Sequence, residues 1–268
     1  MVWLTWRQHR MQLVVTVALL AAAGLALMVD ALPTDVVKML PWTPVLIGLF
    51  WGVPLLVKEY ERGTFQVVWT QSVTRRHWLL AKFGMLGATV AVAGLAVGWL
   101  VAASSADEPY VNRMGDLFGV SGVAPAGWFL LLFVLGAAAG AFLRRTLPAM
   151  AVTIAVFAAL VVAGFLGREH YAEPELAFGA AVPAGAMVTD IGWMNAAGAT
   201  VSADDLSNVC PGSTDPAGCV TAMGYDRGYT AYHPASRYWR FQWTETAILV
   251  LGAVALAGFT VHRTVRRG

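Results

Sequence analysis

The sequence predicts an all-α integral membrane protein with six transmembrane helices, because it is rich in long apolar runs and poor in charge. Of its 268 residues, 58% are hydrophobic and 13% are charged, whereas a soluble domain carries about 25% charged residues. A helix needs about 20 apolar residues to cross a hydrocarbon core of roughly 30 Å. Runs of about this length predict spans at residues 11–29, 41–57, 79–103, 126–143, 147–166 and 241–261.

The first two spans each have an alternative interpretation. Basic residues precede the run at 11–29, as they precede a signal peptide, but the run is long for a signal and further spans follow it. We therefore expect an uncleaved first helix. The run at 41–57 is the shortest and contains Pro44 and Pro54. It is either a complete span or partly re-entrant.

The loops between the spans predict the orientation of the chain. When the loops are assigned to alternate sides, most of the eighteen lysines and arginines fall on the side that holds both termini. The positive-inside rule places this side, and therefore both termini, in the cytoplasm. The protein is expected in the plasma membrane. Segment 58–78 is then a cytoplasmic loop and segment 167–240 a large extracellular loop. The net charge is only +2, and the basic residues are distributed among the loops in the way that orients a protein in a lipid bilayer. They form no basic stripe on a soluble face, so no nucleic-acid partner is expected.

The loop at 58–78 is predicted to contain a short amphipathic helix. Its apolar residues recur at helical spacing from Gly63 onward and include Phe65, Val68, Trp69 and Val73. Carboxylates precede this helix and arginines close it, where each charge favours the nearer helix end. From periodicity alone, two interpretations remain open: a helix lying on the inner leaflet, or a docking element for a soluble partner.

Motifs in this loop resemble those of a known family. Glu59, Glu61, Gly63 and Thr64 form the pattern acidic–x–acidic–x–Gly–Thr, followed by "TQS" at 70–72 and "RRHWLLAK" at 75–82. These motifs resemble the first cytoplasmic loop of ABC transporter type-2 permeases, most of all the short single-permease kind common in actinobacteria. Residues 5–10, 48–54 and 233–243 are similar to the same group. Ser72 departs from the proline that many relatives have there.

The resemblance implies a function for the loop. In that family it forms the coupling helix, which sits in a cleft of a cytoplasmic ABC ATPase, so Phe65, Val68 and Trp69 are expected to form the docking ridge. The chain is then a permease subunit that pairs with a second copy or a paralogue and exports an amphipathic drug, peptide or lipid-like molecule. The residues implied in coupling are Glu59, Glu61, Gly63, Thr64, Phe65, Val68, Trp69, Arg75 and Arg76.

The chain carries no motif for catalysis of its own. A Walker A loop needs Gly-Lys followed by Ser or Thr, and none of the three lysines has these neighbours. No catalytic residue, metal site or cofactor is therefore expected in this chain, and ATP and magnesium would be bound by the partner ATPase. The competing interpretation is a membrane-anchored structural or sensory protein without an ATPase partner.

The expected extracellular loop is rich in Gly, Ala, Pro and Asp, a composition that favours turns and short helices over a packed domain. It also contains the only two cysteines, Cys210 and Cys219. In an oxidising exterior we favour a structural disulfide between them over free thiols.

Two features of the spans have open roles. Glu245 is the one carboxylate inside a predicted span, and such charges usually face protein or a water-filled cavity. It is interpreted as a clamp with Arg237 or Arg240, as part of the substrate pathway, or as a group that reaches the interface. The spans also hold Gly-x-x-x-Gly pairs, which permit close helix packing within the chain or between subunits: Gly48/Gly52, Gly94/Gly98 and Gly136/Gly140.

Overall fold

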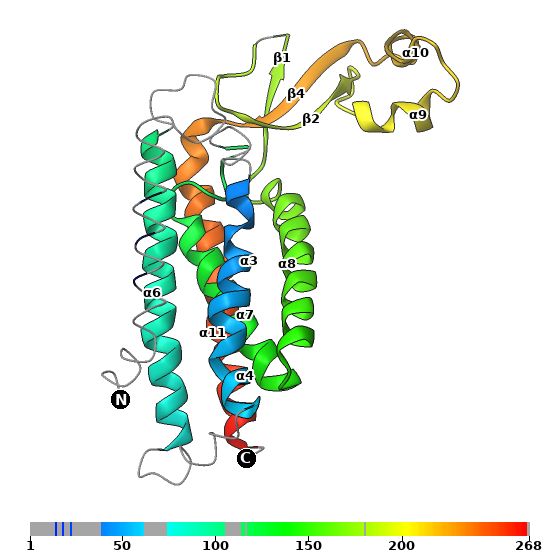
Figure 1. The fold of residues 1–268 in the computed structure, drawn as a ribbon. Coiled ribbons are helices and arrows are strands. Elements are labelled where there is room, and N and C mark those ends of the chain that lie inside the picture. The colour runs from blue at the N-terminus through cyan, green and yellow to red at the C-terminus, as the bar shows by residue number, and fades with distance from the viewer. Residues whose placement is uncertain are drawn as a thin grey trace. The chain divides into compact units, whose positions relative to one another are not determined.

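The structure of the chain is a computed structural model that describes residues 14, 18, 22, 39–61, 74–104, 114–115, 117–179 and 181–266. The chain divides into two compact units, described separately below (Figure 1). The helical unit lies within Met1–Glu108, Phe118–Gly164 and Gln242–Gly268. The sheet unit lies within Pro109–Leu117 and Phe165–Phe241.

A single long helix built of four segments opens the described part of the helical unit. The segments are η1 (Leu40–Trp42), α3 (Thr43–Ile47), the π-helical η2 (Gly48–Gly52) and α4 (Val53–Glu61). Pro44 lies in the first turn of α3, where a missing N–H is tolerated. Pro54 follows the π-helical segment, whose wider turn accommodates a residue that would disrupt an ordinary α-helix. The predicted span at 41–57 is therefore a continuous helix.

Four more long helices follow in the sequence. They are α6 (Arg75–Ser104), α7 (Ala124–Leu143), α8 (Thr146–Arg168) and α11 (Tyr238–Arg266). With Leu40–Lys58, they give five helices in the described residues that are long and apolar enough to cross a membrane. These five match five of the predicted spans, which confirms the mostly helical architecture. The run at 11–29 lies outside the described residues except Val14, Ala18 and Ala22, which are helical, so the sixth span stays a prediction.

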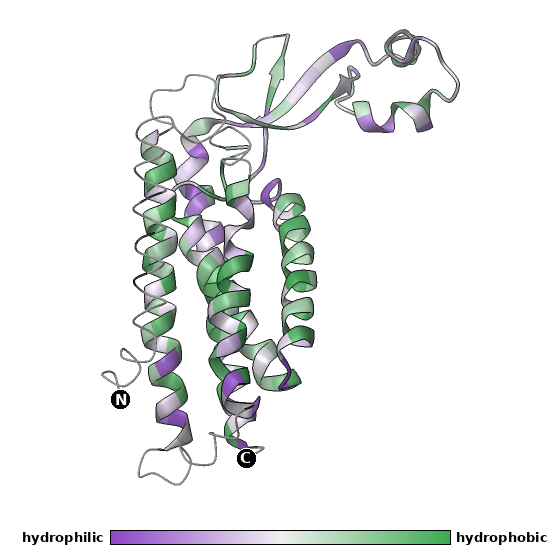
Figure 2. Cartoon of the chain, in the orientation of Figure 1, coloured by the Kyte–Doolittle hydropathy of each residue, from purple (hydrophilic) through white to green (hydrophobic). Residues whose placement is uncertain are grey.

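α7 forms the core of the helical unit. In its apolar stretch 78% of the residues are buried, against 17% in α8, so α7 is surrounded by protein while α8 is mostly exposed. α7 packs against α6 and against the long helix made of α3, η2 and α4. Figure 2 shows hydrophobic residues along all these helices and hydrophilic residues gathered near the ends of α4 and α6.

The start of α6 differs from the prediction. We expected Arg75 and Arg76 to close the short helix of the preceding loop, but these arginines begin α6. The hydroxyl of Thr74 accepts a hydrogen bond from the amide of His77 (3.4 Å), and the carbonyl of Thr74 accepts one from the amide of Trp78 (3.1 Å). Thr74 therefore acts as the N-cap of α6, although cations are unfavourable at a helix N-terminus.

The sheet unit contains a four-stranded antiparallel sheet in the order β1-β4-β2-β3. Its strands are β1 (Glu175–Phe178), β2 (Met187–Met194), β3 (Thr200–Ser202) and β4 (Arg227–His233). Between β3 and β4 lie η3 (Ala203–Asp205), α9 (Leu206–Val209) and α10 (Pro216–Ala222). The short turn η4 (Ala235–Arg237) precedes α11.

The expectation of turns and short helices without a packed domain for 167–240 is wrong, because the segment buries a small core of its own. Along β4 the side chains of Tyr229, Ala231 and His233 are buried while the residues between them are half-buried. This period of two is the pattern of a strand with one covered face. A second cluster, around Val201 and Val220, includes Cys210 and Cys219, which form a disulfide.

Candidate functional site

The predicted coupling segment is described only at its ends. Residues 62–73 lie outside the described residues, and with them Gly63, Thr64, Phe65, Val68 and Trp69. Before this gap, α4 carries Glu59 in its last turn and ends at Glu61. After it, α6 begins at Arg75, and the side chain of Arg76 is exposed.

At the first of these ends, Glu61 contacts a helix that is distant in sequence. One carboxylate oxygen of Glu61, Oε1, accepts two hydrogen bonds from Thr146, one from its amide nitrogen (3.2 Å) and one from its hydroxyl (2.9 Å). Thr146 is the first residue of α8, whose first amides have no partner within the helix. A carboxylate at this position also interacts favourably with the helix dipole. The last residue of α4 therefore caps α8.

Further along the same helices, the helical unit is held together by direct backbone contact. A Cβ atom added to Gly136 of α7 would overlap the carbonyl oxygen of Gly48 and lie 2.9 Å from the amide nitrogen of Val53. A Cβ atom added to Gly140 would lie 2.7 Å from the carbonyl oxygen of Val53. The glycines of η2 and α7 thus pack within the chain, as small residues do at close helix crossings.

A buried polar cluster joins α11 to the start of α7. The side-chain oxygen of Gln242 accepts hydrogen bonds from the amides of Val123 (3.0 Å) and Ala124 (2.8 Å), and its Nε2 donates to the carbonyl of Phe118 (2.8 Å). Glu245, one turn further along α11, accepts a hydrogen bond from the indole Nε1 of Trp128 (2.8 Å). Gln242 is fully buried and Glu245 is 2% exposed, so this cluster satisfies polar groups that water does not reach.

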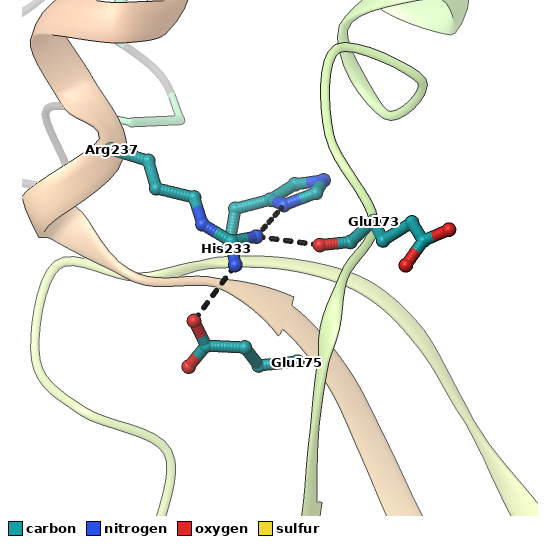
Figure 3. Close-up of polar contacts among 4 residues, drawn as sticks. All are labelled: Glu173, Glu175, His233 and Arg237. Atoms are coloured by element: carbon teal, nitrogen blue, oxygen red, sulfur yellow. Dashed lines mark hydrogen bonds and ion pairs between the residues drawn. The ribbon is translucent and has the colours of Figure 1, made fainter.

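In the sheet unit, Arg237 is the centre of a second polar cluster (Figure 3). Its Nη1 donates to the carbonyl of Glu173 (2.6 Å), and its Nη2 pairs with the carboxylate of Glu175 (2.8 Å). Nη1 also lies 3.2 Å from Nδ1 of His233. A guanidinium only donates hydrogen bonds, so Nδ1 accepts, and Nε2 carries the proton that it donates to the carbonyl of Glu169 (3.2 Å). This network describes a neutral His233.

The same unit has an open pocket beside a third network. Asp190 accepts hydrogen bonds from the hydroxyls of Ser202 (2.5 Å) and Tyr229 (2.6 Å). Burial and the neighbouring carboxylate raise the pKa of Tyr229 to about 12, so this phenol remains a donor. The pocket has a volume of about 740 Å³ and is lined by Glu169, His170, Ala172, Glu173, Pro174, Leu176, Thr189, Asp190, Thr200, Tyr229 and Ala231.

Comparison with known proteins gives one finding. The model of the family described as "ABC-2 membrane transporter related" matches residues 30–166, just over half of the 268 residues. The chain belongs to this family. It is an ABC-2 type permease and a multi-pass membrane protein. No curated protein and no solved structure gives a match.

The matched range of the permease contains the contacts of the helical unit that lie near segment 62–73. It includes α4, that segment, α6, α7 and nearly all of α8, and so the Glu61–Thr146 contact and the glycine contacts. The sheet unit and α11, with Gln242, lie beyond it.

Sequence reasoning missed three residues of these clusters in the permease. Thr146 had a local signal, since it follows two arginines and begins an apolar run, but its partner lies 85 positions away. Gln242 and His233 stand in motifs that the resemblance included, yet no pattern indicates that Gln242 binds the start of α7. Of the two arginines predicted as partners of Glu245, Arg237 is bound to Glu173 and Glu175, and the pairing with Arg240 stays a prediction.

The stability of the sheet unit is expected to fall in acid because of His233. Burial, opposed by the contact with the Glu169 carbonyl and reinforced by the charge of Arg237, lowers the pKa of this imidazole from its ordinary value of 6.5. The unfolded chain therefore binds the proton more readily than the folded chain. The contribution of neutral His233 to the stability of the sheet unit is complete above about pH 6.5 and is lost as the pH falls toward the lowered pKa. The charged groups that face the ring are Arg237, Glu169 and Glu175.

Hydrogen exchange of β4, corrected for intrinsic rates, measures this effect. Between pH 7 and pH 5 the protection of β4 is expected to fall by up to about tenfold per pH unit. In His233→Gln this part of the pH dependence disappears, whereas His170→Gln, a matched change at an exposed histidine, keeps it. An unchanged pH dependence in His233→Gln would assign the effect to other groups.

Proposed function

We propose that this permease is the transmembrane subunit of an ATP-driven exporter that moves an amphipathic drug, peptide or lipid-like substrate. The observation that carries the proposal is the family match over residues 30–166, which includes segment 62–73. In the proposed arrangement, a second copy or a paralogue completes the pathway, and segment 62–73 with the ridge Phe65, Val68 and Trp69 is the coupling element.

The energy comes from a separate ABC ATPase in this proposal. The lysines of the chain are followed by Met39, Glu59 and Phe83, so the Gly-Lys-Ser/Thr sequence that binds phosphate and magnesium is missing from the sequence. The permease itself is then not an enzyme, and ATP and magnesium are bound by its partner.

The charge distribution supports an orientation in the plasma membrane with both termini and segment 58–78 in the cytoplasm. Exposed basic side chains lie at the start of α6, in the connection between α7 and α8, and at the end of α11. Loops with such an excess of Lys and Arg usually stay on the cytoplasmic side.

Affinity purification from native membranes in mild detergent tests the proposal. We expect wild type to bring down an ATPase with a Walker A loop. The double variant Val68→Asp/Trp69→Asp places charge on the predicted docking ridge and is expected to lose that ATPase. Gln66→Asp/Thr70→Asp, on other faces of the same predicted helix, is the matched control and is expected to retain it.

Two outcomes of this purification would contradict the proposal. If wild type brings down no ATPase under conditions that preserve a known transporter complex, the exporter hypothesis is wrong. The chain is then better explained as a membrane-anchored structural or sensory protein. If the ridge variant and its control retain the ATPase equally well, the docking element lies elsewhere in the permease.

A further inference from the structure

We propose that Glu61 is a positioning residue that connects the coupling segment 62–73 to α8, so that displacement of the segment is passed to α8 through Thr146. The inference rests on the proposed function, because it assigns a path to a motion that the ATPase would supply. Glu61 is the residue from which segment 62–73 continues, and its carboxylate holds the first residue of α8 by two hydrogen bonds.

The hydrogen bonds between Glu61 and Thr146 can hold the end of α4 and the start of α8 together. Both donors of Thr146 converge on one carboxylate oxygen, and hydrogen bonds to an ionised acceptor are stronger than neutral ones. The amide of Thr146 has no acceptor within α8 because it lies in the first turn. If α4 moved away from α8, this amide would lose the partner that the structure gives it, so the two helix ends are expected to move together.

Apolar packing next to the contact acts in the same direction. Val53 and Val57 of α4 are fully buried against Ala139 of α7 and Ala149 of α8. The end of α4 therefore meets the α7–α8 connection with one polar and one apolar contact. The Glu61–Thr146 hydrogen bonds are exposed, and exposed polar contacts alone contribute little, but the buried apolar packing holds the same helices together.

The connection between α7 and α8 gives α8 a pivot. Only Arg144 and Arg145 separate the two helices. Arg144 adopts a left-handed conformation with φ 53°, and its amide donates to the carbonyl of Gly140 (3.0 Å), which ends α7. α7 is packed on several sides, whereas only 17% of the apolar stretch of α8 is buried, so displacing α8 breaks few contacts. A pull on Thr146 is therefore expected to tilt α8 about this short turn while α7 stays in place.

Hydrogen exchange of the first turn of α8, measured on the purified permease–ATPase complex, tests the link. The complex is compared without nucleotide and with ATP, magnesium and vanadate, in wild type, Glu61→Ala and Thr146→Val. Thr146→Ser keeps both donors and is the conservative variant. Thr89→Val is the matched control, because the Thr89 hydroxyl donates only to the carbonyl of Met85 within α6.

The proposal predicts a specific pattern of exchange. In wild type, Thr146→Ser and Thr89→Val, trapping with nucleotide changes exchange in the first turn of α8. Without nucleotide, the amides of this turn are expected to exchange about fivefold faster in Glu61→Ala than in wild type, because Thr146 loses both of its hydrogen bonds to Glu61. In Glu61→Ala the nucleotide-dependent change disappears, and in Thr146→Val, which keeps the amide hydrogen bond, it is reduced, although the ATPase still co-purifies with both variants.

The contradicting outcomes are distinct. If the ATPase is bound but the first turn of α8 in wild type does not respond to nucleotide, or if Glu61→Ala keeps the response, the link is wrong while the exporter remains supported. If no ATPase is recovered with wild type, the proposed function fails, and this inference fails with it.

Discussion

Gly136→Ala is expected to lower the free energy of unfolding of the permease by about 2 kcal/mol or more. The added Cβ would overlap the carbonyl oxygen of Gly48 and approach the amide nitrogen of Val53. Both neighbours are backbone atoms of one helix, so no side chain can turn aside to relieve the overlap. The η2 segment and α7 would have to separate, and the packing of the central helix would be lost along this crossing.

The same substitution at another glycine is the control for this prediction. Gly84 of α6 has no atom within 4 Å of its added Cβ, so Gly84→Ala meets open space. Because alanine favours a helix by about 1 kcal/mol over glycine, this variant is expected to be neutral or slightly stabilised. Thermal unfolding of both variants in the same detergent measures the contrast. Equal melting temperatures for the two variants would show that the helix crossing at Gly136 is looser than the structure describes.

Gln242→Met is expected to have an effect of similar size for a different reason. Methionine has nearly the same length and volume, so the packing of α11 is preserved while three hydrogen bonds are lost. The substitution leaves two amides at the start of α7 and the carbonyl of Phe118 without their side-chain partner in a buried place. Each of the two amides that loses its acceptor costs about 1–3 kcal/mol, so the loss is expected to reach about 3 kcal/mol.

Thr246→Val provides the comparison within the same helix. The Thr246 hydroxyl donates only to the carbonyl of Gln242 one turn earlier, and losing it leaves the backbone of α11 paired. Its melting temperature is expected to stay close to that of wild type, while Gln242→Met melts earlier and shows faster exchange at the start of α7. If the two variants behave alike, water or a neighbouring group replaces the bonds of Gln242.

The spans of this permease were predictable because a helix in a bilayer must be long and apolar, which leaves a signal in local composition. The limits of α7 and α8 fall within two residues of the predicted runs. The contacts between the helices were not predictable, because a Gly-x-x-x-Gly pair does not state its partner. The structure gives Gly136 a partner in η2 and Glu61 a partner in α8, and both pairings join residues far apart in sequence.

The sheet was missed for a reason that lies in its composition. Turn-forming residues dominate 167–240, and they obscured the alternation of buried residues in "GYTAYH" of β4. A count of period-two matches over this short stretch would have indicated a strand. The Arg237 cluster has no comparable signal, because its members come from β1, the segment before it, β4 and η4.

The bridge between Cys210 and Cys219 has a consequence for the biogenesis of the protein. Thiols are oxidised outside the cytosol and kept reduced within it, so in the proposed orientation the bond is expected to form only after segment 167–240 has crossed the membrane. A mass spectrum of the intact protein tests this expectation, because a molecule whose cysteines stayed reduced retains the hydrogen atoms of both thiols. The oxidation state of the cysteine pair would thus test the proposed orientation independently of any count of charges in the loops.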